Sequence, residues 1–291
     1  MMEIAAQTAM TPISPAKENK DSDTYSWGHD PAMLNLYQWR QVTNSAPHLI
    51  PHLRPGLKIL DVGCGPGTIT IDLAQRVLPG GHVTGVDYKA EPLEPARALA
   101  QKKGITNVRF AVADVLDLRD FADASFDIVY AHQVVQHVQD PVRAIREMSR
   151  VVKPGGIVAL RESVNMSWYP ELDGMRKWYS LYKQLGKELG GNPDGGLALH
   201  AWTKEAGFDR EAITCSAGVW CFSTPEEKKF WGNNASERTS SPDFKEKTVG
   251  KNICTEEELK QILQGWEDWQ QSEDSWFLIT HAEVVARKPV G

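Results

Sequence analysis

The chain has 291 residues, of which 24% are charged and 41% are hydrophobic, and its formal net charge at pH 7 is -6. This composition is typical of a globular protein that forms one large domain, or a core with a smaller covering part. The acidic balance and the lack of a block of basic residues argue against a nucleic-acid partner. No apolar run is long enough to span a bilayer, so we expect no membrane span.

Cysteine usage and the N-terminal sequence indicate the compartment. The four cysteines form neither a CxxC pair nor a disulfide-like pattern, and the N-terminus lacks a signal-peptide core. We therefore expect a cytoplasmic protein in a reducing setting, either a monomer or a homodimer. Residues 1–23 are rich in Pro, Ser, Lys and Glu, which predicts a disordered tail.

The segment 24–53 is expected to contain a helix that starts near Pro31. Asp30 precedes this proline, and an aspartate cap followed by proline at the first helical position favours a helix start. Tyr25 and Trp27 lie just before it. Two interpretations remain open for these rings: packing against the core, which the residues alone favour, or a flap that closes over a ligand.

The stretch from Lys58 to Val77 predicts a buried strand, a glycine turn and a helix. Glycine at positions 63, 65 and 67 lets the chain turn sharply and removes the Cβ atoms that would hold a ligand away from the backbone. The helix that follows directs its unpaired N–H groups toward the turn. The stretch therefore predicts a loop that binds a nucleotide-like cofactor.

The glycine spacing and one acidic residue narrow the class of cofactor. The dinucleotide fingerprint requires glycine at its first, third and sixth positions, and the sixth position counted from Gly63 is Thr68. Asp61 ends the strand before the loop, where a carboxylate is a poor neighbour for a pyrophosphate and a good one for a cation. An NAD-dependent oxidoreductase is therefore disfavoured.

The next predicted strands also end in polar residues. Asp87 lies 20 residues after Gly67, where a doubly wound sheet places a carboxylate that binds the ribose hydroxyls. Asp114 ends the third strand and suits the exocyclic amine of adenine, and His132 follows the fourth strand. Because parallel strands end at one edge of a sheet, we expect these side chains to share a site with Asp61.

Strands that alternate with helices indicate the α/β class, and we expect a doubly wound, mostly parallel seven-stranded Rossmann-like sheet with helical lid insertions after strands 5 and 6. The core of the domain 24–291 is expected at about 57–162, 208–222 and 276–288, and the lid elements at about 24–53, 163–207 and 223–275. Strands are predicted at 59–62, 82–87, 108–114, 126–131, 157–160, 213–222 and 277–287, and helices at 95–103, 141–152, 168–189, 224–232 and 255–271.

Several motifs carry a resemblance to a known family. The pattern Asp61-x-Gly-x-Gly-x-Gly resembles motif I of class I S-adenosylmethionine-dependent methyltransferases, whose cofactor carries an ammonium and a sulfonium group. After the tail of residues 1–23, nearly the whole chain is similar to small-molecule methyltransferases of the ubiquinone/menaquinone-biosynthesis type. This similarity is carried by the runs 39–46, 60–70, 131–141, 152–156, 168–170, 206–208 and 276–284. It implies a methyltransferase that uses S-adenosyl-L-methionine and releases S-adenosyl-L-homocysteine.

These considerations give a set of expected site residues. All ten tryptophans lie outside residues 40–167, and aromatic rings either line a pocket for a flat apolar ligand or pack helices together. We expect packing for most of them, with Trp27, Trp168 and Tyr169 as substrate-pocket candidates. No metal is expected, because no Cys/His cluster has ligand spacing. The expected cofactor contacts are Tyr25, His29, Arg40, Asp61, Gly63, Gly65, Gly67, Asp87, Tyr88, Asp114, Val115, His132 and Gln133.

Catalysis of methyl transfer requires a base only if the acceptor carries a proton that must leave. His132 is the best-placed imidazole, either as that base or as a positioning group. His137 is the second catalytic candidate, and its position on the following helix favours a structural role. Two classes of function stay open at this point. One is in-line methyl transfer to a small, largely apolar metabolite. The other is a protein of the same fold that binds the cofactor without transferring its methyl, as a regulator or as a catalyst of a rearrangement or cyclisation.

Overall fold

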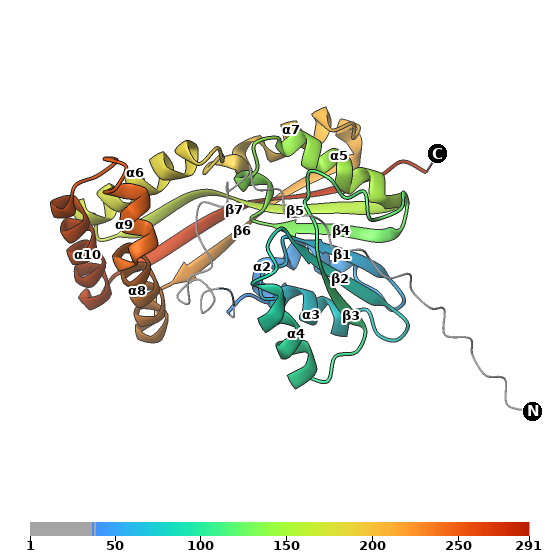
Figure 1. Cartoon of the computed structure of the whole chain (residues 1–291), viewed down its shortest axis with the longest axis horizontal. Coiled ribbons are helices and arrows are strands. Elements are labelled where there is room, and N and C mark those ends of the chain that lie inside the picture. The colour runs from blue at the N-terminus through green and yellow to red at the C-terminus, as the bar shows by residue number, and fades with distance from the viewer. Residues whose placement is uncertain (1–36, 38, 291) are drawn as a thin grey trace, which may run out of the picture.

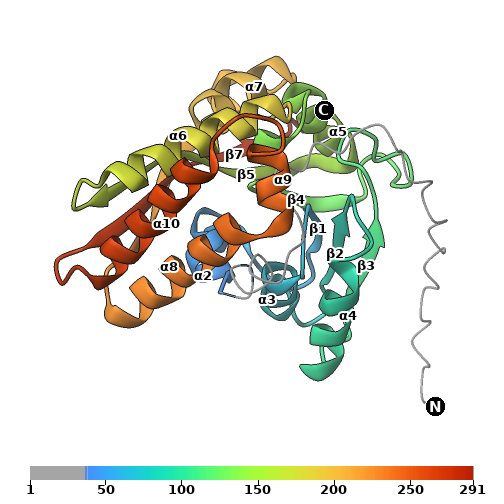
Figure 2. The same cartoon turned by 60° about the vertical axis from the view of Figure 1, so that its left-hand side comes forward.

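A computed structural model describes residues 37 and 39–290, and its centre is a seven-stranded sheet (Figures 1 and 2). The strand order is β3-β2-β1-β4-β5-β7-β6, with β1 to β5 parallel and β7 antiparallel to both of its neighbours. The predicted mostly parallel, doubly wound sheet is therefore confirmed. The strands are β1 (Lys58–Val62), β2 (His82–Asp87), β3 (Val108–Val112), β4 (Phe126–His132), β5 (Val152–Tyr169), β6 (Ile213–Phe222) and β7 (Trp276–Arg287).

Helices cover both faces of the parallel part of the sheet (Figure 1). Alternate residues of β1 belong to different hydrophobic clusters: Leu60 packs with residues of α5, and Ile59 packs with residues of α3. One face carries α2 (Val42–Ser45), η1 (Pro47–His52), α3 (Thr68–Arg76) and α4 (Leu93–Lys102). The other carries α5 (Pro141–Val151) and α7 (Leu199–Glu205), with the short turns η2 (Val135–His137), η3 (Gly195–Ala198) and η4 (Arg210–Ala212).

Helix α5 shows how local sequence sets these elements. Asp140 caps it by accepting a hydrogen bond from the backbone N–H of Arg143 at 2.9 Å, and Pro141 occupies the first turn. Ile145 and Met148, three residues apart, are both fully buried against the sheet. The predicted start at Pro141 is confirmed, and the helix ends one residue earlier than predicted.

Strand β5 is far longer than the sequence predicts. It was expected to end at Leu160, with a helix beginning at Trp168; instead β5 continues to Tyr169, and α6 begins at Asp173. The prediction for this boundary was wrong because β7 continues alongside: Trp168 pairs with Phe277 across the two strands. Cross-strand aromatic pairs of this kind stabilise a sheet and are not visible in a local sequence pattern.

The distal halves of β5, β6 and β7 carry four helices and form what we call the aromatic lobe (Figures 1 and 2). Trp266 and Trp269 are fully buried there, and the Trp231 ring stacks on Phe277 with centroids 5.4 Å apart. Most tryptophans of the described residues thus pack against one another. The helices are α6 (Asp173–Glu188), α8 (Pro225–Ser240), α9 (Pro242–Thr248) and α10 (Glu256–Gln271).

Several predictions fall outside the described residues: the disordered tail 1–23, the helix expected from Pro31, and the roles of Tyr25, Trp27 and His29. Of the later helices, α8 runs eight residues past its predicted end at Gly232, and α9 was not predicted. Within residues 39–290, no helix combines the length and the apolar character needed to cross a bilayer.

Helices α6 and α10 cross at a pair of glycines. A Cβ atom built on Gly174 would lie 2.2 Å from the carbonyl oxygen of Gln261 and 2.8 Å from Cα of Gly265. The two backbones therefore approach more closely than residues with a Cβ atom would permit, and this close approach brings the neighbouring tryptophans into contact.

We predict that Gly174→Ala lowers the free energy of unfolding by about 1–3 kcal/mol, because the helices must separate to admit the methyl group. Denaturant unfolding measures the change. Gly186→Ala on the same helix is the matched control: its nearest neighbour, Pro193, would lie 3.4 Å from the new Cβ, so this variant should be neutral or slightly stabilising. Equal stability of the two variants would contradict the close crossing.

Candidate functional site

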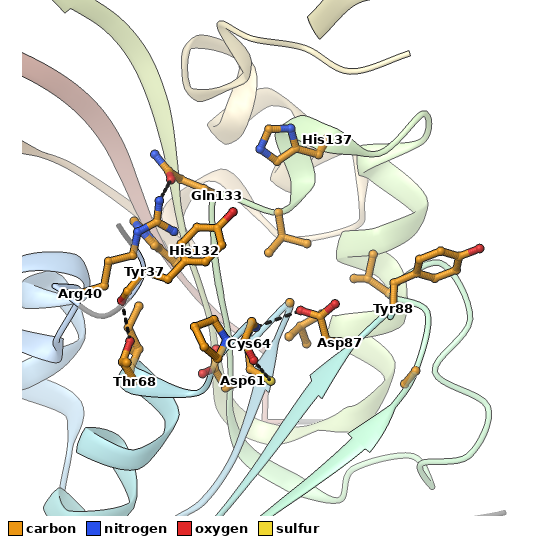
Figure 3. Close-up of a pocket in the computed structure, with 18 of the residues that line it drawn as sticks. Tyr37, Arg40, Asp61, Cys64, Thr68, Asp87, Tyr88, His132, Gln133 and His137 are labelled. Carbon is orange, nitrogen blue, oxygen red and sulfur yellow. Dashed lines mark hydrogen bonds between the residues drawn. The ribbon is translucent and has the colours of Figure 1, made fainter. Parts of the chain in front are cut away.

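A cavity opens at the edge of the sheet where β1, β2 and β4 end (Figure 3). Ten of the thirteen expected cofactor residues lie on its wall: Arg40, Asp61, Gly63, Gly65, Asp87, Tyr88, Asp114, Val115, His132 and Gln133. Tyr25 and His29 lie outside the described residues. The sequence analysis did not single out Tyr37, Cys64, Pro66, Thr68, Ile69, Ala113, Val134 or Val138, which also line the cavity.

The glycine turn after β1 forms the floor of this cavity. Gly63 and Gly65 adopt φ values of +66° and +52°, a region that favours glycine. A Cβ on Gly63 would lie 2.3 Å from Val134 Cγ2, whereas one on Gly65 would meet nothing within 4 Å. The backbone at Gly65 is therefore open to the cavity, and its N–H donates to Asp87 Oδ2 at 2.9 Å, which ties the turn to β2.

The third glycine of the motif has a different place. Gly67 does not line the cavity; a Cβ there would lie 2.8 Å from the Phe110 ring and 2.9 Å from Ala96 Cβ. It allows the start of α3 to pack closely against β3 and α4. The spacing pattern alone treats the three glycines as equivalent, and only the tertiary contacts distinguish them.

Asp61 is the most deeply buried carboxylate of the site. Asp61 is only 2% exposed, and its Oδ2 accepts a hydrogen bond from Thr70 Oγ1 at 2.6 Å. Burial raises the pKa of Asp61 to about 7, although the hydrogen bond from Thr70 opposes the rise. A cation placed beside this carboxylate would stabilise its ionised form.

Backbone N–H groups hold the other two carboxylates in place. Asp87 accepts from Gly65 through Oδ2 and from the backbone of Lys89 through Oδ1, the latter at 3.2 Å. Asp114 Oδ1 accepts from the backbone of Leu116 at 2.8 Å. Both carboxylates are thus oriented at the cavity wall before any ligand arrives, and Figure 3 shows Asp87 there.

His132, the last residue of β4, lies on the cavity wall and is only 5% exposed. Within the part of the chain that the structure describes, neither of its ring nitrogens makes a hydrogen bond. Burial is the main cause that lowers the pKa of His132 well below its usual value, followed by the positive charges of Arg40 and Arg161. The ring is therefore neutral at physiological pH, with one nitrogen able to accept a proton.

Gln133 follows directly in an unusual backbone conformation. Its φ is +54°, and its side chain connects two groups of the site: Arg40 Nη2 donates to Oε1 at 2.7 Å, and Nε2 lies 3.1 Å from His281 Nε2. Non-glycine residues in this region are strained and often belong to functional sites. Figure 3 shows the Arg40 guanidinium held against the Gln133 side chain at the wall of the cavity.

Glu162 is a residue that the sequence analysis missed. It is fully buried next to the end of β4, and its Oε1 accepts from the backbone N–H groups of Val134 and Val135, each at 3.0 Å. Burial raises the pKa of Glu162 to about 8 against the effect of these hydrogen bonds. The side chain fixes the loop that carries Gln133. A carboxylate two residues after the predicted apolar strand 157–160 was the available signal.

The remaining candidates are divided between the cavity and the lobe. His137 lines the cavity, and its Nε2 lies 3.0 Å from Nε2 of Gln136. Burial lowers the pKa of His137 to about 3. Neither Trp168 nor Tyr169 lies on the wall: Trp168 packs in the aromatic lobe near Phe277, and Tyr169 is 54% exposed. Trp27 is outside the described residues.

Comparison with known proteins identifies the family. Residues 53–264 match the family model described as a methyltransferase domain, which is well over half of the chain. The chain belongs to the methyltransferase family. This places the acidic cavity at the edge of the sheet within a family that uses S-adenosylmethionine as its cofactor, and the enzyme is an S-adenosylmethionine-dependent methyltransferase.

Two relatives show how far the similarity extends. The uncharacterized methyltransferase C1B3.06c of Schizosaccharomyces pombe is 31% identical over 278 residues, which cover 91% of this chain and 96% of that protein. Demethylmenaquinone methyltransferase of Staphylococcus aureus is 38% identical over 130 residues, 45% of this chain and 51% of that protein. The predicted resemblance to methyltransferases, including one of the menaquinone-biosynthesis type, is confirmed.

Solved structures support the same fold. A phosphoethanolamine N-methyltransferase 2 from Haemonchus contortus, solved with S-adenosylhomocysteine, aligns with 92% of this methyltransferase and 60% of that chain, with a TM-score of 0.55 and 19% identity. The same enzyme in complex with S-adenosyl-L-methionine gives a TM-score of 0.51 over 84% of this chain and 52% of that one, at 20% identity.

We predict that Glu162→Ala lowers the free energy of unfolding by about 2 kcal/mol or more, because two backbone N–H groups lose their acceptor. Glu162→Gln retains an acceptor oxygen and should stay close to the parent at pH 7, where the parent carboxyl is protonated. Urea titrations of both variants test this, and an equal loss in both would contradict the role of the acceptor.

The pH dependence provides a second measurement on the same variants. Since the folded-state pKa of Glu162 is raised to about 8, the unfolded state ionises first and the parent loses stability as pH rises from about 4.5 to 8. Glu162→Gln should lack this part of the decline. In this variant, stability should still decline as the pH rises to about 7, because the pKa of Asp61 is also raised.

Proposed function

We propose that this methyltransferase transfers the methyl group of S-adenosylmethionine to a small, largely apolar metabolite, with His132 beside the accepting atom. One observation carries the proposal. A neutral His132 ring, without a hydrogen-bond partner among the described residues, lies on the wall of the cavity that also holds Asp61, Asp87 and Asp114. Such a ring can accept a proton from a nucleophile close to the cofactor.

The carboxylates and Arg40 match the polar groups of the cofactor. We assign Asp61 to the ammonium group, Asp87 to the ribose hydroxyls and Asp114 to the adenine amine, while Arg40 faces the cofactor carboxylate. The open backbone at Gly65, on the same wall as Asp61 and Asp87, leaves space for the ligand. The donor and acceptor groups on the wall thus fit S-adenosylmethionine better than they fit a dinucleotide with its pyrophosphate.

When bound, S-adenosylmethionine supplies a methyl group that is activated by a positively charged sulfur. The side chains of this chain align the acceptor for in-line attack and exclude water from the cavity. As the bond from the acceptor atom to the methyl carbon forms and the carbon–sulfur bond breaks, an acceptor that carries a proton becomes strongly acidic. His132 then takes that proton, and a weakly basic imidazole is sufficient for this.

Apolar side chains near His132 support an apolar acceptor. Val134 and Val138 line the cavity, and the Trp220 ring lies 5.5 Å from that of His132. Trp39 packs edge-on against Trp220 at 5.1 Å. The similarity over 130 residues to demethylmenaquinone methyltransferase, which is named for a menaquinone precursor, supports the same choice.

The experiment that tests the function directly uses S-adenosylmethionine with an isotopically labelled methyl group. The protein is incubated with this cofactor and a cell extract, and mass spectrometry identifies the metabolite that gains the label. We expect a small apolar product together with S-adenosylhomocysteine. Binding of the cofactor without label in any metabolite would contradict methyl transfer and favour a non-transferring role.

We predict that Asp87→Ala weakens the binding of S-adenosylmethionine by about 1.5–3 kcal/mol, because the ribose hydroxyls lose a charged acceptor. Calorimetry measures the affinity, and NAD should show no binding. Asp120→Ala, at an exposed position outside the cavity, is the matched control and should bind like the parent. An unchanged affinity in folded Asp87→Ala would remove Asp87 from the ribose role.

We predict that His132→Asn reduces kcat by roughly 10²–10⁴ while the affinity for the cofactor stays close to that of the parent. Since the pKa of His132 lies well below its usual value, the parent rate should be flat above about pH 6.5. Steady-state kinetics and calorimetry measure the two effects.

His137→Asn is the control for the loss of a second histidine in the same cavity, and it should affect stability more than the rate. Parallel losses of affinity and turnover in His132→Asn would instead indicate that His132 positions the cofactor. If His137→Asn alone abolished turnover at full cofactor affinity, the two assignments would be reversed.

A further inference from the structure

A second cavity lies outside the cofactor site, between η1, the start of β6 and the end of β7. Its volume is about 600 Å³, and the residues on its wall are distinct from those of the cofactor cavity. We call it the basic groove, and the residues that define it here are His48, His52, Thr214, Ser216, Arg287 and Lys288. Nothing in the proposed methyl transfer uses these residues.

His48 is the central feature of the basic groove. Its side chain is 3% exposed, and its Nδ1 lies 3.5 Å from Oε1 of the buried Glu283. Neither ring nitrogen makes a hydrogen bond within the described residues. Both ring nitrogens are buried, and the Glu283 carboxylate orients the ring where it lines the groove, as carboxylates orient other histidines.

Glu283 is itself held in place from the other side. Ser216 Oγ donates to its Oε2 at 2.8 Å, and Arg161 Nε donates to its Oε1 at 3.1 Å. Ser216 therefore uses its hydroxyl hydrogen on Glu283 and does not face His48 as a nucleophile would. The geometry supports binding in this groove rather than covalent catalysis.

The charges around the groove have one predominant sign. Arg287 and Lys288 lie on its wall with His52, whereas Glu211 is the one carboxylate among the lining residues that the structure describes. The pKa of His52 is lowered first by burial and then by the positive charge of Arg287 and by His48, which reflects a positive local potential. This concentration of cations occurs on a chain whose net charge is -6.

Lys288 and Arg287 have different parts in this arrangement. Lys288 Nζ donates to the backbone carbonyls of Ser149 and Val152 at 2.6 and 2.8 Å, so it holds the end of the chain against α5. Arg287 uses Nη1 on the carbonyl of Gly155 at 2.8 Å, and its exposed side chain leaves further donors on the groove side.

We propose that the basic groove binds a small anion that carries a carboxylate or phosphate group, with Arg287 as its principal donor. Thr214 contributes a hydroxyl on the same wall. An arginine fork beside a hydroxyl is suited to the oxygens of such a group, and the volume admits a metabolite larger than the anion alone.

Calorimetric titrations with inorganic phosphate and, separately, with citrate test the proposal at constant ionic strength, on protein whose cofactor site is filled with S-adenosylhomocysteine. We expect saturable binding of at least one probe and a loss of affinity of about tenfold in Arg287→Gln. Lys103→Gln removes the same charge from an exposed position at the end of α4 and should bind like the parent.

The two probes distinguish the source of the oxyanion, because a preference for either one assigns a phosphate or a carboxylate ligand. Binding that fails to saturate with both probes, or that weakens equally in Arg287→Gln and Lys103→Gln, would overturn the proposal. Arg287 is exposed, so its variant is expected to fold, and circular dichroism checks this. The result is independent of methyl transfer, since no measurement depends on activity.

Discussion

The buried ion pair between Arg161 and Glu283 is the constraint around which both cavities are arranged. The two side chains are 1% and 4% exposed and face each other across neighbouring strands, β5 and β7. Leaving either charge without its partner in this environment would cost several kcal/mol. The pair therefore fixes the relation between the parallel part of the sheet and its antiparallel edge, and it places the Arg161 charge 4.9 Å from the Trp220 ring.

Adjacent residues on β5 serve opposite faces of the sheet. Arg161 pairs with Glu283 and so with His48, while Glu162 accepts hydrogen bonds from the loop after β4. The positive charge of Arg161 is also one of the causes that keep His132 neutral. The same short stretch of β5 thus orients the cofactor loop, sets the protonation state of the central histidine and supports the wall of the basic groove.

Much of this enzyme is predictable from local sequence. Asp61, Asp87 and Asp114 lie at or within two residues of the ends of β1, β2 and β3, although β3 ends at Val112, two residues before its predicted end, and parallel strands bring their carboxyl ends to one edge of a sheet. The contacts made by Arg161 are different in kind. Its partner Glu283 lies 122 residues away in sequence, so no local pattern relates the two.

The errors in the sequence-based predictions also come from contacts between residues that are far apart in sequence. The start of α6 was misplaced because Trp168 is held in a strand by Phe277, a residue of β7. Gly67 was grouped with the cofactor glycines because its packing against Phe110 involves another strand. In both cases tertiary contacts override the local sequence pattern, whereas at the strand ends the local pattern gives the correct placement.

The length of β5 has a consequence for how the lobe can move against the core. Because β5 and β7 stay paired from Ile157 with Arg287 to Tyr169 with Trp276, with one register shift between Ser163 and Asn165, the aromatic lobe and the cofactor core belong to the same sheet. Hinge motions are absorbed by a few residues in loops or at the ends of elements, and the irregularity at residues 163–165 is the one break in this pairing. Cross-strand backbone hydrogen bonds on both sides of the break therefore resist a large rotation of the lobe against the core.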